Sequence, residues 1–197
     1  LMRHISNIKN VYKLPLTVAI NKFPTDTDAE IGVIESECRK VGVSVILSDA
    51  WAKGGSGAEE LAREVVRLCG EENDFSFCYE SEIGIKDKIN AVVRRIYGGN
   101  GVIYTKKAER EISKLTELGF GNFPVCIAKT QYSFSDDAQR LGAPDGFEIT
   151  VRNVRVSAGA GFIVALTGEI MTMPGLPRVP AAEKIDVDEN GVISGLF

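Results

Sequence analysis

The chain has 197 residues, of which 44% are hydrophobic and 25% are charged, and its formal net charge is -4 at pH 7. A chain of this length buries about 70% of its unfolded surface, so we expect one large globular domain or slightly more. The acidic balance and the dispersed Lys and Arg residues argue against nucleic-acid binding. No apolar run reaches the roughly 20 residues that a membrane span needs, so we expect a cytoplasmic protein without a membrane partner.

The cysteines lie far apart in the sequence, form no Cys-x-x-Cys pair, and are accompanied by a single histidine, His4. A structural zinc site needs closely spaced ligands of these types, so we predict no metal site. Free, buried thiols in a reducing cytoplasm are the expected state of Cys38, Cys69, Cys78 and Cys126.

The first part of the chain alternates between helix and strand patterns. Helical spacing of apolar residues predicts that residues 1–12 form the later part of a helix, and residues 16–20 form a strand. Thr27 and Glu30 have the spacing of a capping box, which predicts a helix that ends at Gly42. The expected buried face of this helix consists of Ile31, Ile34, Cys38 and Val41.

A second strand and a second helix follow. Residues 43–47 are apolar and rich in β-branched side chains, which predicts a strand covered on both faces. Ser56 and Glu59 form another capping-box pair before a helix that is expected to bury Leu61, Val65, Leu68 and Cys69. This order predicts an α/β fold, namely the end of a P-loop-type parallel sheet with flanking helices. Because the first strand follows half a helix, we expect further strands upstream and interpret the chain as a fragment.

The strand–helix rhythm changes near residue 72, where we place a boundary between residues 1–72 and a smaller α+β domain of residues 73–197. Helical spacing predicts helices over 85–96 and 108–118, with a turn at 98–101 between them. Strands are predicted at 124–128, 147–156 and 162–166. Asn190 and Gly191 separate the short apolar runs 185–187 and 192–193, which predicts a C-terminal hairpin.

Two aromatic residues follow the first two predicted strands. Phe23 comes directly after Asn21-Lys22, and Trp51, the only tryptophan, follows the second strand. Ligands of open α/β sheets bind at the carboxyl ends of the strands, so we expect both rings at one edge. Two such rings can hold a planar heterocycle between them, at roughly 1–3 kcal/mol per ring by analogy with nucleobase stacking. The alternative is that Trp51 fills a seam between domains.

Two nucleotide-binding patterns are incomplete in this sequence. Asn21-Lys22 is similar to the start of the Asn-Lys-x-Asp element of GTPases, but Pro24 replaces the aspartate that hydrogen-bonds to guanine. Lys53 precedes the glycines of 54–57, and no Gly-Lys-Ser/Thr occurs in the chain, so a Walker-type phosphate loop is missing. Either the chain uses no triphosphate, or the phosphate loop belongs to another part of the protein.

Several longer motifs are distinctive. They are Val-Ala-Ile-Asn-Lys-Phe-Pro-Thr-Asp-Thr at 18–27, Trp-Ala-Lys-Gly-Gly at 51–55, Ala-Lys-Thr-Gln-Tyr-Ser-Phe-Ser-Asp-Asp at 128–137, Val-Arg-Val-Ser-Ala-Gly-Ala-Gly-Phe-Ile-Val-Ala-Leu-Thr-Gly at 154–168, Ile-Met-Thr-Met-Pro-Gly-Leu-Pro at 170–177 and Gly-Leu-Phe at 195–197. Together they resemble formate–tetrahydrofolate ligase, also called formyltetrahydrofolate synthetase. The resemblance covers nearly the whole chain and corresponds to the C-terminal third or so of that enzyme.

The resemblance implies a function. In that family ATP phosphorylates formate to formyl phosphate, and an amine nitrogen of tetrahydrofolate attacks it to give 10-formyltetrahydrofolate, with Mg²⁺ and a monovalent cation as cofactors. It also implies that the pterin lies between Phe23 and Trp51, with Pro24 and Leu47 lining the slot, and that the enzyme is a homotetramer. The phosphate loop and the groups that handle formyl phosphate belong to the N-terminal portion of the same enzyme. We therefore expect this chain alone to bind folate weakly, to hold no cofactor and to contain no catalytic residue.

Other interpretations stay open at this point. The chain could be a non-catalytic folate-binding or oligomerisation module, or half of a GTPase, which Pro24 argues against. Residues 129–137 contain several hydroxyl groups, a lysine and two carboxylates. These groups could contact a nucleotide or magnesium, or they could form a polar loop whose groups hydrogen-bond to one another. The small residues of 157–161 suit close backbone approach. Residues 171–177 suit a contact to adenine or to another subunit. No role is assigned to these three stretches.

Overall fold

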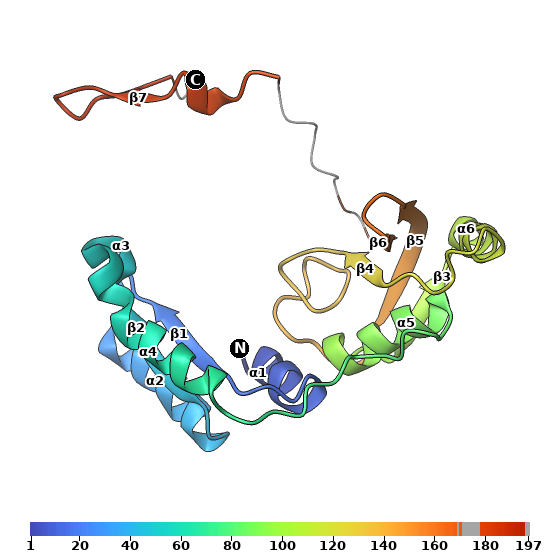
Figure 1. Ribbon diagram of the computed structural model, residues 1–197, viewed down its shortest axis with the longest axis horizontal. Helices are drawn as coiled ribbons and strands as arrows, with labels where there is room; N and C mark the ends of the chain where they lie inside the picture. Colours follow the sequence, from blue (N-terminus) through green and yellow to red (C-terminus); the bar gives the residue numbers. More distant parts are fainter. Residues whose placement is uncertain (169, 171–177, 196–197) are drawn as a thin grey trace.

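A computed structural model of the chain describes residues 1–168, 170 and 178–195, and these residues form a mixed α/β structure with parallel strands and flanking helices (Figure 1). The predicted α/β class is confirmed at this level. The P-loop type of the sheet and the division at residue 72 stay predictions. Residues 171–177, for which a contact to adenine or another subunit was considered, lie outside the described residues.

The first part of the chain is built on two parallel strands. Helix α1 (Met2–Ser6) continues into the π-helical turn η1 (Asn7–Val11), and both precede strand β1 (Thr17–Asn21). Strand β2 (Ser44–Ser48) pairs with β1 in parallel, from Thr17 opposite Ser44 to Asn21 opposite Ser48. The two predicted strands and their expected side-by-side arrangement are therefore confirmed.

Helix α2 (Asp28–Lys40) begins with the predicted capping box. The Glu30 backbone N–H donates to Thr27 Oγ1 at 3.3 Å, and the Thr27 backbone N–H donates to Glu30 Oε2 at 2.9 Å. Such a cap contributes about 0.5–2 kcal/mol because it satisfies backbone donors that the first helical turn leaves without partners. Ile31 and Cys38 of this helix are buried, and Cys38 packs with Val43, directly before β2, and with Val45 of β2.

Helix α4 (Glu59–Cys69) covers the other face of β2, because the Ser44 hydroxyl, between Val43 and Val45, donates to Glu64 of α4. The predicted Ser56–Glu59 capping box is wrong. Residues Gly54–Ala58 form the 3₁₀ turn η2, and Ser56 Oγ donates to the Lys53 carbonyl at 2.9 Å instead. The start of α4 has no side-chain cap.

The predicted buried face of α4 is also wrong. The helix has no buried residue, and Val65 and Cys69 are exposed while Leu61 and Leu68 are half-buried. Strand β2 has a helix against each face, but these helices bury it incompletely, since only Ser48 is buried in it and Leu47 is exposed. Helical spacing shows which residues share a face, but it does not show whether the described part of the chain supplies enough neighbours to cover that face.

The second part of the chain carries the larger core. Helix α5 (Ile85–Val92), extended by the turn η3 (Val93–Tyr97), and helix α6 (Lys106–Glu117) pack on a sheet of β3 (Gly101–Tyr104), β4 (Val125–Ala128), β5 (Glu148–Ser157) and β6 (Phe162–Thr167). The strand order is β3-β5-β6-β4, with β3/β5 and β4/β6 parallel and β5/β6 antiparallel. Strand β3 was not predicted, because its four residues begin inside the predicted glycine turn.

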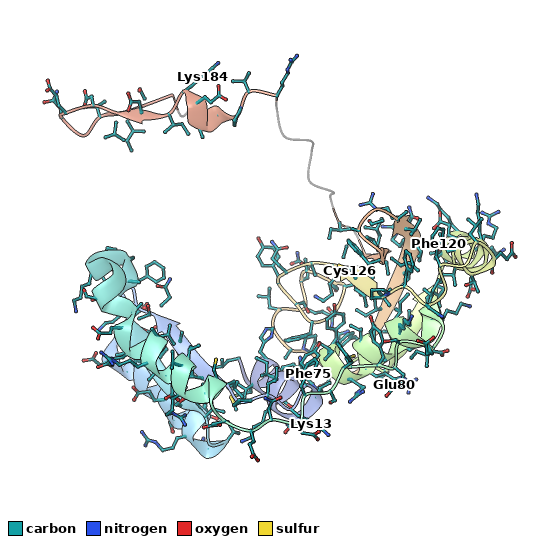
Figure 2. The ribbon with its side chains drawn as sticks, in the orientation of Figure 1. Lys13, Phe75, Glu80, Phe120, Cys126 and Lys184 are labelled. Atoms are coloured by element: carbon teal, nitrogen blue, oxygen red, sulfur yellow. The ribbon has the colours of Figure 1, made fainter. Side chains whose placement is uncertain are left out.

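The segment between the two parts runs past the N-terminal helix, where Lys13 and Phe75 lie close together (Figure 2). The Ser76 backbone N–H donates to the Tyr12 carbonyl at 3.2 Å, and Lys13 Nζ lies 2.7 Å from Asp74 Oδ2. The N-terminal helix itself contacts both parts, since Ile5 belongs to the core beside α2 while Asn7 Nδ2 donates to the Ile96 carbonyl.

Two further predictions concern the C-terminal hairpin and the cysteines. The C-terminal hairpin is confirmed, with β7 (Asp186–Val187) antiparallel to β8 (Ile193–Ser194) and Gly191 at φ +78° in the turn. A short 3₁₀ turn, η4 (Ala181–Glu183), precedes it. All four cysteines are free, but only Cys38 and Cys78 are buried, so the expectation of burial is wrong for Cys69 and Cys126.

Candidate functional site

The carboxyl ends of β1 and β2 are held together one residue beyond the strands. The Lys22 backbone N–H donates to the Ser48 carbonyl at 3.1 Å, so the parallel pairing continues and places Lys22 beside Asp49. A tight turn follows, because Asp26 accepts from the Phe23 backbone N–H through Oδ2 at 2.8 Å and its own N–H donates to the Phe23 carbonyl. The turn fixes the backbone that carries Phe23 at this edge of the sheet.

Trp51 reaches the same edge from the neighbouring strand. It lies on the short helix α3 (Ala50–Lys53) that follows β2, and its indole Nε1–H donates to the Lys22 carbonyl at 2.7 Å. Phe23 and Trp51 are 52% and 58% exposed, although large aromatic side chains are usually buried when they serve only packing. Among the described residues the two rings do not stack on each other or on another aromatic ring.

A pocket of about 660 Å³ lies at these strand ends and is lined by Leu47 together with Lys22 and residues of the segment that leads into α4. Of the four residues predicted for the pterin slot, only Leu47 belongs to this lining, and Phe23, Pro24 and Trp51 do not. Pro24, the fourth residue of the predicted pterin slot, is exposed in the turn after Phe23. Charged residues make up much of the lining: Lys22, Asp49, Lys53, Glu59, Glu60 and Arg63. Sequence reasoning assigned no role to Asp49, although its position directly after β2 was a signal that could have found it.

The glycine-rich loop holds Asp49 in place and does not form a phosphate cradle of the Walker type. The Asp49 backbone N–H donates to the Gly57 carbonyl at 3.0 Å, and a Cβ at Gly57 would lie only 2.3 Å from the Asp49 carbonyl oxygen. Gly54 has φ +60° and ψ -142°, a conformation that only glycine adopts readily. Lys53 Nζ lies 3.0 Å from Asp49 Oδ2 and closes the loop with an ion pair.

Comparison with known protein families identifies the family to which this chain belongs. A family model described as formate–tetrahydrofolate ligase matches residues 1–197, the entire chain. The chain belongs to the formate–tetrahydrofolate ligase family. Enzymes of this family are ATP-dependent ligases that act on formate and tetrahydrofolate, and they use ATP and Mg²⁺. The resemblance found in the sequence is therefore confirmed, including its extent along the chain.

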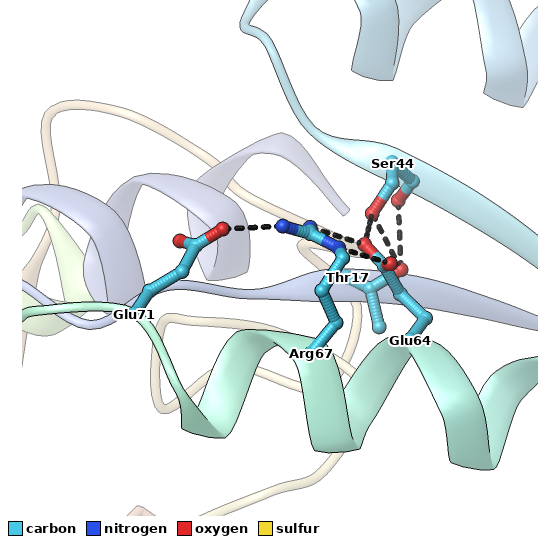
Figure 3. Close-up of polar contacts among 5 residues, drawn as sticks. All are labelled: Thr17, Ser44, Glu64, Arg67 and Glu71. Carbon is cyan, nitrogen blue, oxygen red and sulfur yellow. Dashed lines mark hydrogen bonds and ion pairs between the residues drawn. The ribbon is translucent and has the colours of Figure 1, made fainter.

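In this ligase chain, a polar network at the opposite, amino ends of β1 and β2 anchors helix α4 (Figure 3). Arg67 donates to both oxygens of Glu64, from Nε at 2.7 Å and from Nη2 at 2.8 Å, and Ser44 Oγ donates to Glu64 Oε1 at 2.7 Å. These hydrogen bonds, those of Arg67 first, lower the pKa of Glu64 to about 2. The network fixes α4 against the strands from the side away from Phe23 and Trp51.

The stretch 129–137 forms a loop after β4 whose polar groups largely satisfy one another. Lys129 Nζ donates to the carbonyls of Thr130 and Ser133 and lies 5.2 Å from the centre of the Tyr97 ring. Burial lowers the pKa of Lys129, and Ser133 and Ser135 are buried with their hydroxyls hydrogen-bonded to each other. A second pocket of about 730 Å³ lies beside this loop and includes Asp136, Thr150 and Gly168.

The stretch 157–161 is the turn between β5 and β6. Gly161 has φ +74°, which explains a glycine there, but a Cβ at Gly159 or Gly161 would meet no atom within 4 Å. The expected close approach of another backbone is therefore not found at these glycines. In the described ranges, no group of three or more His, Cys, Asp or Glu side chains is arranged to hold a metal ion. No helix of the same ranges is long and apolar enough to cross a membrane.

Proposed function

We propose that this chain supplies the pterin-binding wall of an ATP-dependent formate–tetrahydrofolate ligase that makes 10-formyltetrahydrofolate through formyl phosphate. The observation that carries the proposal is the hydrogen bond from Trp51 Nε1 to the Lys22 carbonyl, which fixes an exposed indole at the strand end that bears the exposed Phe23. In this proposal the pterin stacks between Phe23 and Trp51, and Pro24 and Leu47 complete the slot.

In the proposed reaction, a formate oxygen attacks the γ-phosphorus of ATP, which gives formyl phosphate and ADP. The amine nitrogen of tetrahydrofolate then attacks the formyl carbon, the bond from that carbon to the phosphate oxygen breaks, and the nitrogen loses a proton. The second step depends on holding the nucleophile in line with the formyl carbon. The chain contributes this placement, because the stacked pterin fixes the position from which the amine nitrogen reaches formyl phosphate.

The phosphate chemistry is assigned to the N-terminal portion of the enzyme. The sequence contains no Gly-Lys-Ser/Thr, and the described residues offer no cluster of three acidic, His or Cys side chains that fits Mg²⁺, so the metal-binding groups are assigned to that portion as well. We therefore propose that the chain alone binds folate and has no ligase activity. The whole enzyme is proposed to use a monovalent cation, to assemble as a homo-oligomer and to reside in the cytoplasm.

Titration with tetrahydrofolate tests this function. Tryptophan fluorescence of the chain should be quenched on binding, because Trp51 is the only tryptophan. In calorimetric titrations, Phe23→Ala and Trp51→Ala should each raise the Kd for tetrahydrofolate about tenfold or more, which corresponds to the loss of one stacking contact. Phe77→Ala is the matched control, since Phe77 is 71% exposed and lies outside this edge. Equal Kd values for all variants, or 10-formyltetrahydrofolate production by the chain alone, would contradict the proposal.

A further inference from the structure

Two charged residues with complementary hydrogen-bonding roles follow the paired ends of β1 and β2 and line the pocket there. The parallel register pairs Asn21 with Ser48, and the hydrogen bond from the Lys22 N–H to the Ser48 carbonyl extends it, so Lys22 and Asp49 are the next residues of adjacent strands. Both line the pocket that also contains Leu47. A carboxylate only accepts hydrogen bonds, and an ammonium group only donates them.

Asp49 is the enclosed carboxylate of this pocket. Its side chain is 32% exposed, whereas Glu59 and Glu60 are exposed and stand on the first turn of α4. The backbone of Asp49 is fixed through the Gly57 carbonyl, and its carboxylate pairs with Lys53 through Oδ2. Glu59, in contrast, is engaged by Arg63 Nη2 at 2.5 Å.

A pterin presents a matching edge. Its pyrimidine ring carries a 4-oxo group, an N3–H and a 2-amino group in sequence, which is one acceptor followed by two parallel donors. Guanine has the same edge. The Asn21-Lys22 pair resembles an element of GTPases in which an aspartate two residues beyond the lysine binds that edge, and here Pro24 occupies the position of the carboxylate.

We propose that Asp49, on the neighbouring strand end, supplies the missing carboxylate and is the residue that selects pterins. Its carboxylate accepts from N3–H and the 2-amino group, and the Lys22 ammonium donates to the 4-oxo oxygen. This inference rests on the proposed function, because it assumes that the pterin occupies the wall of Phe23 and Trp51. The aromatic rings hold any flat heterocycle, whereas the Asp49–Lys22 pair distinguishes a 2-amino-4-oxo ring from others.

The test compares tetrahydrofolate with its 2-desamino analogue in calorimetric titrations. The wild-type chain should bind tetrahydrofolate at least about tenfold more tightly, because hydrogen bonds to a charged acceptor are among the stronger ones. Asp49→Asn should raise the Kd for tetrahydrofolate about tenfold and reduce the preference over the analogue to about twofold or less. Asp87→Asn makes the same carboxylate-to-amide change at an exposed residue in the first turn of α5, outside the lining of this pocket, and should leave both Kd values unchanged.

The outcomes separate this inference from the function on which it rests. If the wild-type chain binds both ligands equally, the inference is overturned. This comparison needs no variant, so it tests the inference even if Asp49→Asn does not fold. The inference is also overturned if tetrahydrofolate binding depends on Phe23 and Trp51 while Asp49→Asn keeps the wild-type preference. If the wild-type chain does not bind tetrahydrofolate, or binds it independently of both rings, the proposed function itself has failed.

Discussion

Gly57 is the residue at which the loop after β2 leaves no room for a side chain. A Cβ there would lie 2.3 Å from the Asp49 carbonyl oxygen and 2.5 Å from its carbon, and both atoms are backbone that cannot move without displacing the loop. The same backbone carries Asp49 and leads into Trp51. A shift of the loop at Gly57 would therefore also move these two residues.

Gly57→Ala should therefore destabilise the chain by about 1–3 kcal/mol, which is the usual cost of forcing an extra carbon into a filled site. Urea unfolding followed by circular dichroism measures the effect. Gly55→Ala is the matched control, because a Cβ at Gly55 meets nothing within 4 Å and its φ lies outside the left-handed region. Equal unfolding midpoints for the two variants would show that the loop adapts to the added carbon.

At the level of elements, helix α4 is held to the strands by polar contacts instead of by a buried apolar face. Glu64 accepts from Ser44 of β2 and from Arg67 of its own helix, and Arg67 Nη1 also donates to Glu71 at 2.5 Å (Figure 3). Ser44 Oγ in turn lies 2.9 Å from Thr17 Oγ1 of β1, so the network spans both strands.

This anchoring predicts a pH dependence of stability. The pKa of Glu64 is lowered from 4.5 to about 2, so the folded chain binds fewer protons at this group than the unfolded chain does. The stabilisation is then fully present above the unfolded pKa and is lost as the pH falls toward the folded one. Glu64→Gln should lower the urea midpoint at about pH 6, and its difference from wild type should shrink by about pH 3.

The control for the Glu64 experiment is Glu60→Gln, which removes an exposed carboxylate from the same helix. Its unfolding midpoint should follow that of the wild-type chain over the same pH range. A constant difference between Glu64→Gln and wild type from neutral to acidic pH would show that the ionised carboxylate does not contribute to anchoring α4.

At the scale of the whole molecule, the buried hydrophobic residues of the described ranges form two clusters of unequal size. Counted over the residues that the structure describes, the cluster around β5 and β6 contains twelve buried residues, whereas the one beside α2 contains Ile5, Cys38 and Val43. A small core gives little stabilisation against chain entropy, so we expect the first part of the chain to open more readily than the second.

Limited digestion with a protease that cuts after glutamate tests this difference together with the boundary proposed near residue 72. Glu71 and Glu72 are exposed and follow the end of α4, so early cleavage is expected there. The fragment that starts near residue 73 should then persist, while the one that ends near residue 72 is degraded further. Equal lifetimes of the two fragments, measured by mass spectrometry, would contradict the inferred difference in local stability.

Local sequence patterns correctly predicted those elements whose determining residues lie close together in the sequence. The Thr27–Glu30 box, the Asn190-Gly191 turn and the apolar spacing of Ile85, Ile89 and Ile112 all became the expected elements, because their partners lie within a few residues. The pattern was misleading for Ser56 and Glu59, where the glycines of 54–57 allow a 3₁₀ turn that competes with the cap. Strand β3 was missed because Gly101 has no strand preference of its own, and pairing with β5 decides its state.

The sequence by itself determined the family, the α/β class and the two aromatic residues that follow β1 and β2, since strand order and strand ends can be recognised locally. Only the tertiary structure decided that Lys88 is fully buried with its ammonium donating to the carbonyls of Gly121 and Phe123. It also decided that Trp51 is fixed by the Lys22 carbonyl, and that Lys22 and Asp49 follow directly on the paired strand ends, where the Lys22 N–H donates to the Ser48 carbonyl. These contacts join residues that are about 25–35 positions apart in the sequence. Local conformational preferences do not determine such contacts, because strand register and loop closure bring the residues together.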